Sequence, residues 1–344
     1  MTGRDATGRP RAGGAGRDEA GRPGSAVAEG RAAPWGRVLR VAVALVVLGA
    51  VGFALWTALH EDGPRVLDLF DRPGAVPLLL GACAANIAGL VLGMASWRAL
   101  LADRIGPVAG ARIFFLGQLS KYVPGRVWGV LTHVQLGKRL GVPASRMVGA
   151  YVVSLGVTTL TGAAVGLLVG PAVLGRQAYW LLAPAALVVA CVLRPALLHR
   201  ALVLAARLSR REEPAPAPGT RKALIVATVS WLVSGLHLWA LLLLCGADPV
   251  AGLPVGVGAF ALATVAGSLA LILPDGWGVR ELVLMAALAT VVPWSVAGVV
   301  AVASRLVCVV CEVLTSLTAL GWARLARTAE ARNAERSTHV VEAV

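Results

Sequence analysis

The sequence predicts an all-α polytopic membrane protein with about eight transmembrane helices, a re-entrant helical hairpin and two helices broken at Pro and Gly. Hydrophobic residues make up 57% of the 344 residues and charged residues only 15%, and the mean hydropathy is +0.76. Apolar stretches of about 20 residues recur along the chain, which is the length that crosses the hydrocarbon core of a bilayer. Soluble domains rarely combine these features.

The chain divides into three predicted regions. Residues 1–34 are rich in Gly, Ala, Arg and Pro and lack apolar periodicity, so we expect a disordered cytoplasmic tail rather than a signal peptide. Residues 35–325 form the transmembrane domain, and residues 326–344 form a second cytoplasmic tail. The predicted spans are Val38–Leu59, Val76–Trp97, Met147–Val169, Tyr179–Leu193, Ala223–Cys245, Leu253–Leu273, Val279–Val292 and Ser295–Trp322.

Basic residues predict the topology. Lys and Arg concentrate before the first span, in three alternate loops (residues 98–112, 138–146 and 194–222) and after the last span. The positive-inside rule then places both termini in the cytoplasm. The excess of Arg over Lys, with abundant Ala, Gly and Val, favours a bacterial source and hence the bacterial plasma membrane. The scheme works only if residues 113–137 enter and leave the membrane on one side.

Those residues carry the predicted re-entrant hairpin. The stretch is apolar but contains Lys121 and Arg126 on either side of Pro124-Gly125. Proline removes a backbone donor and glycine permits a sharp reversal, so two short helices should meet inside the membrane. Irregular backbone at that depth needs protein packing or a wet cavity. A polar cavity is therefore expected.

Residues 196–211 are amphipathic, with leucines on one helical face and arginines on another. We expect a helix that lies on the inner leaflet, followed by a Pro/Ala linker to residue 221. A cytoplasmic extension of the fourth span is an alternative.

A second break follows the sixth span, where residues 274–281 read PDGWGVRE. Two interrupted helices in corresponding halves are typical of a transporter site built from half-helices. The N-terminus of the restarted helix attracts anions. Together with Lys121, Arg126 and Arg280, it predicts a ligand that carries phosphate or another anionic group.

The residues at the two breaks resemble a known family. Residues 121–125 (KYVPG) and residues 274–281 resemble the KYxPG and PGGxGxRE motifs of the lysylphosphatidylglycerol synthase transmembrane, or flippase-like, family. The resemblance covers the chain from about Val38 to Leu325. Asp275 stands where the second motif has glycine, which places an acid beside the expected anion site.

The resemblance implies a bacterial membrane protein related to the lipid-translocating half of multiple peptide resistance factors. The chain extends about twenty residues beyond its last span, so we expect no soluble aminoacyl-transfer domain and no lysyl transfer. The predicted residues that bind a lipid headgroup are Lys121, Tyr122, Pro124, Gly125, Arg126, Pro274, Gly276, Gly278, Arg280 and Glu281.

Each charged residue also has a structural interpretation. Lys121 and Arg126 could extend to the cytoplasmic interface, and Arg280 with Glu281 could form a structural ion pair. Arg305 and Glu312 lie seven residues apart on one face of the last span, where Glu312 pairs with a cation of either break, forms a structural pair or couples protons. Trp97, near the end of its span, should anchor at the membrane interface.

The leading functional hypothesis is a carrier that binds and translocates an anionic phospholipid or a polyprenyl-phosphate-linked lipid. One alternative is a polytopic glycosyltransferase that uses a lipid-linked sugar, with Glu61 and Asp62 as catalytic acids. Another is a non-transporting subunit that docks a glycosyltransferase or synthase of envelope biosynthesis. The net charge is +14, but the basic residues lie between the predicted spans, so it does not indicate nucleic-acid binding. The five cysteines suggest no metal site, and no cofactor is expected.

Overall fold

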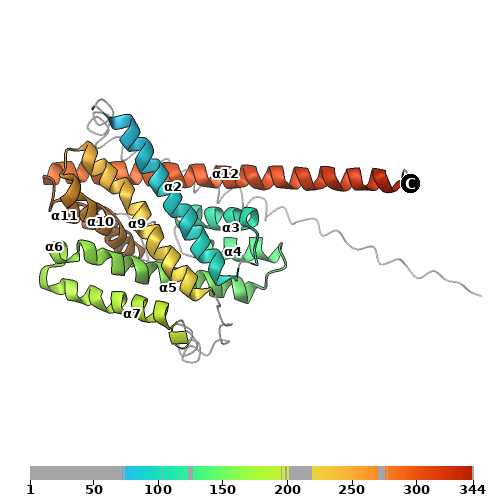
Figure 1. The fold of residues 1–344 in the computed structure, drawn as a ribbon, viewed down its shortest axis with the longest axis horizontal. Coiled ribbons are helices and arrows are strands. Elements are labelled where there is room, and N and C mark those ends of the chain that lie inside the picture. Colours follow the sequence, from blue (N-terminus) through green and yellow to red (C-terminus); the bar gives the residue numbers. More distant parts are fainter. Residues whose placement is uncertain are drawn as a thin grey trace, which may run out of the picture. The chain divides into compact units, whose positions relative to one another are not determined.

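The computed structural model describes residues 72, 74–102, 104–122, 127–194, 196, 197, 200, 219–269, 276 and 278–342. The predicted first span, the N-terminal tail and most of the amphipathic segment lie outside these residues. Every regular element in the described part is helical, which confirms the predicted all-α class (Figure 1). The α-helices are α2 (Ala75–Leu100), α3 (Pro107–Leu119), α4 (Val127–Lys138), α5 (Ala144–Val165), α6 (Gly170–Leu174), α7 (Leu182–Leu193), α9 (Thr220–Leu244), α10 (Pro249–Leu269), α11 (Val279–Leu288) and α12 (Trp294–Glu342). Short 3-10 turns are η1 (Ser120–Tyr122), η2 (Gly166–Leu168) and η3 (Gly175–Leu181).

Five helices in this part of the chain are long and apolar enough to cross a membrane. They are α2, α5 with η2, α9, α10 and the first 33 residues of α12, Trp294–Ala326. Tyr179–Leu193 is a shorter apolar helical stretch. The predicted class of polytopic membrane protein is therefore confirmed, whereas the predicted count of eight spans is not.

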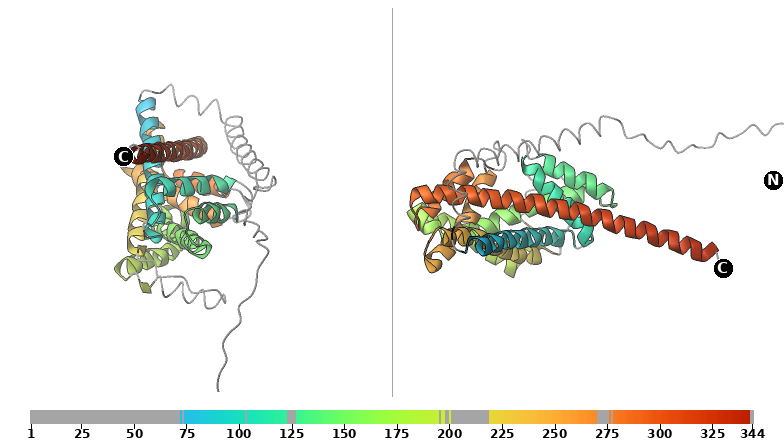
Figure 2. Two further views of the ribbon diagram at one scale, coloured as in Figure 1. Left: turned by 90° about the vertical axis from the view of Figure 1, so that its right-hand side faces the viewer. Right: turned by 90° about the horizontal axis from the view of Figure 1, so that it is seen from above.

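Two elements at the C-terminal end differ from the prediction. A full crossing over Val279–Val292 is not formed, because α11 has only 10 residues and a rise of about 15 Å, half the hydrocarbon thickness. The helix that contains the last predicted span does not end at Trp322. It continues as α12 to Glu342. Figure 2 shows α12 as one helix that extends past the others. Charged residues after Trp322 end the apolar stretch, but Ala, Arg and Glu remain good helix formers.

Small residues allow the central helices to pack closely. The Oγ of Ser230 on α9 donates to the Gly89 carbonyl oxygen on α2 at 2.7 Å, and the Oγ of Ser96 donates to the Ala223 carbonyl oxygen at 2.8 Å. Such contacts are typical of helix pairs in membranes, where apolar burial gives no driving force. Buried side chains form one cluster centred on α9, α10, α11 and α12 and another on α2, α3, α5 and α9.

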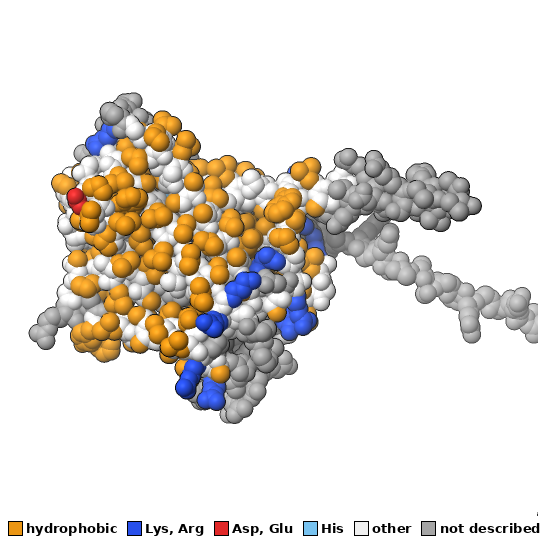
Figure 3. Space-filling view, in the orientation of Figure 1, with side chains coloured by type: hydrophobic (Ala, Val, Ile, Leu, Met, Phe, Trp, Pro, Cys, Tyr) orange, Lys and Arg blue, Asp and Glu red, His pale blue; other side chains and the backbone are white. Residues whose placement is uncertain are grey.

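Helices α3 and α4 are two short helices that pack against each other in the region of the predicted hairpin. The helical residues before the gap end at Tyr122 and α4 begins at Val127, so the predicted break at Pro124-Gly125 lies outside the described residues. The two helices lie side by side at one end of the bundle (Figure 1). Most of the Lys and Arg side chains visible in Figure 3 gather toward this end, and hydrophobic side chains cover much of the remaining face.

The packing of α2 against α9 depends on Gly89. A Cβ at this position would overlap the Oγ of Ser234 and lie 2.8 Å from its Cβ, whereas a Cβ at Gly81, on the same helix, would meet no heavy atom within 4 Å. We predict that Gly89→Ala destabilises the protein by about 1–3 kcal/mol through overpacking, and that Gly81→Ala does not destabilise it. Thermal unfolding of the two variants in detergent checks this, and equal midpoints would contradict it.

Candidate functional site

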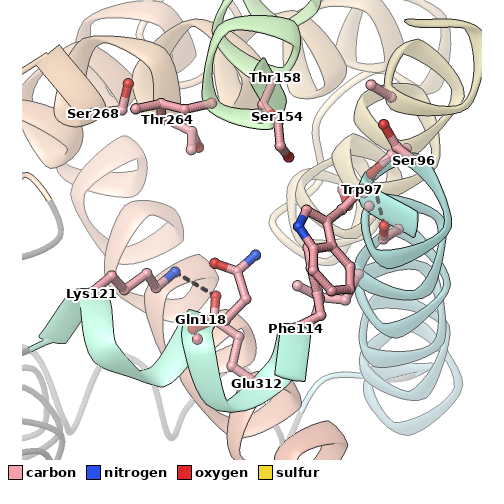
Figure 4. Close-up of a pocket in the computed structure, with 18 of the residues that line it drawn as sticks. Ser96, Trp97, Phe114, Gln118, Lys121, Ser154, Thr158, Thr264, Ser268 and Glu312 are labelled. Atoms are coloured by element: carbon pink, nitrogen blue, oxygen red, sulfur yellow. Dashed lines mark hydrogen bonds and ion pairs between the residues drawn. The ribbon is translucent and has the colours of Figure 1, made fainter. Parts of the chain in front are cut away.

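A cavity of about 320 Å³ lies between the helices. Its volume falls within the roughly 300–1,000 Å³ of small-molecule pockets. Trp97 and Phe114 reach it from one buried cluster, and Trp231 and Phe260 reach it from the other. Hydroxyl and amide side chains supply most of its polar lining, and several point into it from α2, α3, α5 and α10 (Figure 4).

The first interruption, between Tyr122 and Val127, is held by Glu312 of α12. The turn η1 places Lys121 and Tyr122 next to each other, and both contact this carboxylate. Lys121 Nζ lies 2.6 Å from Glu312 Oε1, and Tyr122 OH donates to Oε2 at 2.9 Å. Glu312 is 6% exposed, and a buried carboxylate is tolerated only with such partners.

The second interruption, between Leu269 and Val279, is held by close backbone contact. Gly276 has φ +68°, and a Cβ there would overlap the backbone of Gly267 on α10. A side chain at residue 276 would therefore face both a strained backbone and a steric clash. This contact fixes where the chain turns back toward α11.

Glu281 occupies the N-terminus of α11. Its Oε2 accepts a hydrogen bond from the backbone N–H of Gly278 at 2.8 Å, and its Oε1 forms an ion pair with Arg305 of α12. The carboxylate thus compensates the positive end of the helix dipole. The acid that was predicted to bind a headgroup caps a helix and links it to α12.

Arg280 points to the other side, into the buried interior. It is 5% exposed and lines the cavity, with its guanidinium carbon 5.5 Å from the centre of the Phe260 ring. Its Nη2 donates to Cys308 Sγ at 3.4 Å, and Asn86 Nδ2 donates to the same sulfur at 3.5 Å. These contacts join α2, α11 and α12 at the cavity wall.

One face of α12 therefore serves both interruptions. Arg305, Cys308 and Glu312 are three and four residues apart and lie on the same side of the helix. Arg305 contacts α11 and Glu312 contacts η1. Of the roles predicted for Glu312, the geometry corresponds to pairing with the cation at the first break, Lys121.

The structure separates the predicted site residues into three groups. Lys121 and Arg280 line the cavity, as does Glu312. A second group makes contacts at the two interruptions without lining the cavity: Tyr122, Gly276, Gly278, Glu281 and Arg305. Pro124, Gly125, Arg126, Pro274 and Asp275 lie outside the described residues, as do Glu61 and Asp62.

Two residues of α2, Asn86 and Trp97, line the cavity although neither was predicted as a site residue. Trp97 was predicted as an interfacial anchor, and this was wrong: it is 1% exposed, packs against Phe114 and His133, and lines the cavity. Asn86 Nδ2 donates a hydrogen bond to Cys308 Sγ between α2 and α12, and its Oδ1 is buried without a partner in the described structure. A tryptophan near the end of a span has the same sequence context whether it faces lipid or the protein interior. The sequence therefore could not predict the burial of Trp97.

The comparison with protein families identifies the fold. Residues 37–314 match the profile described as the lysylphosphatidylglycerol synthase TM region. The chain belongs to this family. The match covers most of the sequence, including both interruptions and Glu312, and confirms the predicted resemblance. A search among curated proteins found no match.

The ion pair at the first interruption can be tested by its energetics. Glu312→Gln keeps the size of the side chain but leaves the Lys121 ammonium without its counter-charge. We predict a loss of about 1–3 kcal/mol, less than for a fully buried pair because the Lys121 side chain is 29% exposed. Adding Lys121→Met should restore part of that stability, because it removes the uncompensated cation.

Thermal unfolding of the two single variants and the double variant in detergent gives the coupling energy. Tyr122→Phe is the comparison, since it removes the other hydrogen bond to the same carboxylate without changing any charge and should cost about 1.5–3 kcal/mol. Strict additivity of Glu312→Gln and Lys121→Met would show that the two side chains do not interact.

Proposed function

We propose that this family member binds the phosphate-bearing headgroup of an anionic phospholipid or a polyprenyl-phosphate-linked lipid in the cavity and moves the lipid between leaflets. The observation that carries the proposal is one cation from each interrupted helix at the wall of a single cavity: Lys121 from η1 and Arg280 from α11. Two interrupted helices around one cavity are the arrangement by which transporters form substrate sites.

The charges of the lining favour an anion. Lys121, Arg280 and Glu312 are the charged side chains among the described lining residues, which leaves one net positive charge with His133 neutral. Arginine binds phosphate as a planar fork and lysine as a compact point charge. The Lys121 ammonium has three donor hydrogens, so a phosphate oxygen can bind it beside the Glu312 carboxylate.

The position of the cavity suits a ligand that enters from lipid. On α5, both Leu155 and Thr158 line the cavity and are exposed on the surface. This edge lies on an apolar helix long enough to span the membrane. A headgroup that enters beside α5 can leave its acyl chains in the bilayer.

Movement would follow from competition at Glu312. A phosphate that draws the Lys121 ammonium into the cavity weakens the ion pair between η1 and α12, and the Tyr122 hydroxyl keeps the carboxylate hydrogen-bonded. The hairpin of α3 and α4 is then free to shift against α12. Ligand binding at one leaflet would in this way favour an arrangement open to the other.

The same proposal includes the orientation. The basic end of the bundle faces the cytoplasm of a bacterial plasma membrane, in accordance with the positive-inside rule, and both termini lie on that side. The partners are membrane lipids, and a glycosyltransferase of envelope biosynthesis would supply or consume the transported lipid.

Transport by reconstituted protein tests the proposal. We predict that Lys121→Gln lowers the translocation of fluorescent phosphatidylglycerol in proteoliposomes about tenfold or more, because a charge-assisted hydrogen bond contributes about 1.5–3 kcal/mol. Arg280→Lys, which keeps the charge but not the fork, should have a smaller effect. Arg324→Gln, an exposed change on α12 outside the cavity, is the control. Wild-type transport at the rate of empty liposomes, or equal transport by Lys121→Gln, would contradict the proposal.

A further inference from the structure

Three buried polar atoms at the cavity have no hydrogen-bond partner among the described residues. They are Asn86 Oδ1, Trp97 Nε1 and Thr264 Oγ1, and all three residues line the cavity. Asn86 is 3% exposed and Trp97 1% exposed, so bulk water does not satisfy them. Buried polar groups are nearly always paired, and each unpaired one costs free energy. These atoms therefore indicate a polar occupant.

The positions of these residues on α2 and α10 indicate more than one polar group in the occupant. Asn86 and Trp97 lie eleven residues apart on α2, which corresponds to about 16 Å along the helix axis, and the two positions fall on nearly the same face. Gly89 and Gly93 lie between them in the lining and leave room along the helix. The occupant must therefore carry several polar groups.

The chemistry of the three atoms matches hydroxyl groups. The indole N–H only donates, the amide oxygen only accepts, and the threonine hydroxyl does both. Ser96 and Ser230 donate their hydrogens to helix carbonyl oxygens, so their oxygens remain available as acceptors toward the cavity. A ligand hydroxyl can both donate and accept, and thus complements every one of these groups.

Among the described lining residues, no carboxylate is left over for a cationic headgroup. Glu312 is the carboxylate among the described lining residues, and both of its oxygens are engaged, by Lys121 and Tyr122. An additional ammonium in the cavity would meet Lys121 and Arg280 without a counter-charge of its own. Burying a cation without a counter-charge is costly.

We propose that the headgroup bound here is a neutral, hydroxyl-rich glycosyl or polyol group attached through phosphate, with its hydroxyls on Asn86, Trp97 and Thr264 and its phosphate at Lys121 and Arg280. The inference rests on the proposed headgroup site and names the class of its ligand. Figure 4 shows the arrangement: Lys121 and Glu312 lie on one side of the cavity, with Trp97 and Thr264 on other sides.

Affinities for defined probes test the inference. The purified protein is titrated with short-chain phosphatidylinositol and phosphatidylglycerol, with phosphatidic acid, which carries phosphate alone, and with cationic lysylphosphatidylglycerol. Inositol phosphate and glycerol phosphate serve as soluble probes. We expect phosphatidylinositol or phosphatidylglycerol to bind about tenfold tighter than phosphatidic acid, and the lysyl ester to bind more weakly than its uncharged parent.

Variants assign the preference to the named side chains. Trp97→Phe removes the indole N–H, and Asn86→Leu removes the amide. Each should weaken binding of the hydroxyl-bearing lipid about fivefold to tenfold and leave phosphatidic acid binding unchanged. Trp322→Phe, an exposed change on α12 outside the cavity, is the matched control. Thermal unfolding midpoints show that the variants remain folded.

The outcomes separate this inference from the proposed function. Equal affinity for phosphatidic acid and the hydroxyl-bearing lipids, or a preference for the lysyl ester, overturns the hydroxyl inference and leaves the lipid site standing. Binding of none of the anionic lipids overturns both and leaves the cavity to ordered water. Soluble phosphates that bind as tightly as the lipids support the hydroxyl chemistry and contradict the lipid carrier.

Discussion

Two ion pairs between α12 and the interrupted helices govern the arrangement of the remaining helices. A charge at the centre of a bilayer costs roughly 2.5–3.5 kcal/mol on insertion scales. Arg305 and Glu312 lie on the candidate span Trp294–Ala326, so both need a partner of opposite charge. Arg305 and Glu312 are seven residues apart on α12, about 10 Å along its axis. Because α12 is a continuous helix, this separation sets the distance between the points where the two interrupted helices are held.

The cavity is a consequence of that constraint. An interrupted helix cannot fill the space that a continuous helix would occupy, and the backbone groups at its ends need partners inside the protein. Here Glu281 covers the start of α11 and the Gly276–Gly267 contact closes the turn before it. The space left over is bordered by Lys121, Arg280 and a hydroxyl-rich wall. Polar residues that hold the fold thereby also create a place for a polar ligand.

The sequence predicted those features that depend on local composition. Apolar stretches near 20 residues located α2, α9 and α10 to within a few residues, because hydrophobic thickness alone dictates them. Proline and glycine predicted breaks at Pro124-Gly125 and after Pro274, and most of the residues of both breaks lie outside the described part of the chain. What it did not predict depends on tertiary contacts or on length: the burial of Trp97 among Phe114 and His133, the partner of Glu281, and the short α11. The continuation of α12 to Glu342 was also missed, since charged residues end a span but not a helix.

The most direct test of the account is an electron cryo-microscopy structure of the protein in nanodiscs of its native lipids. We expect headgroup density within the cavity, with a phosphate in contact with Lys121 Nζ and the remainder of the headgroup beside Trp97 on α2. The acyl chains should leave beside α5. A cavity that holds only water or an acyl chain, with the Lys121–Glu312 pair still closed, would contradict it.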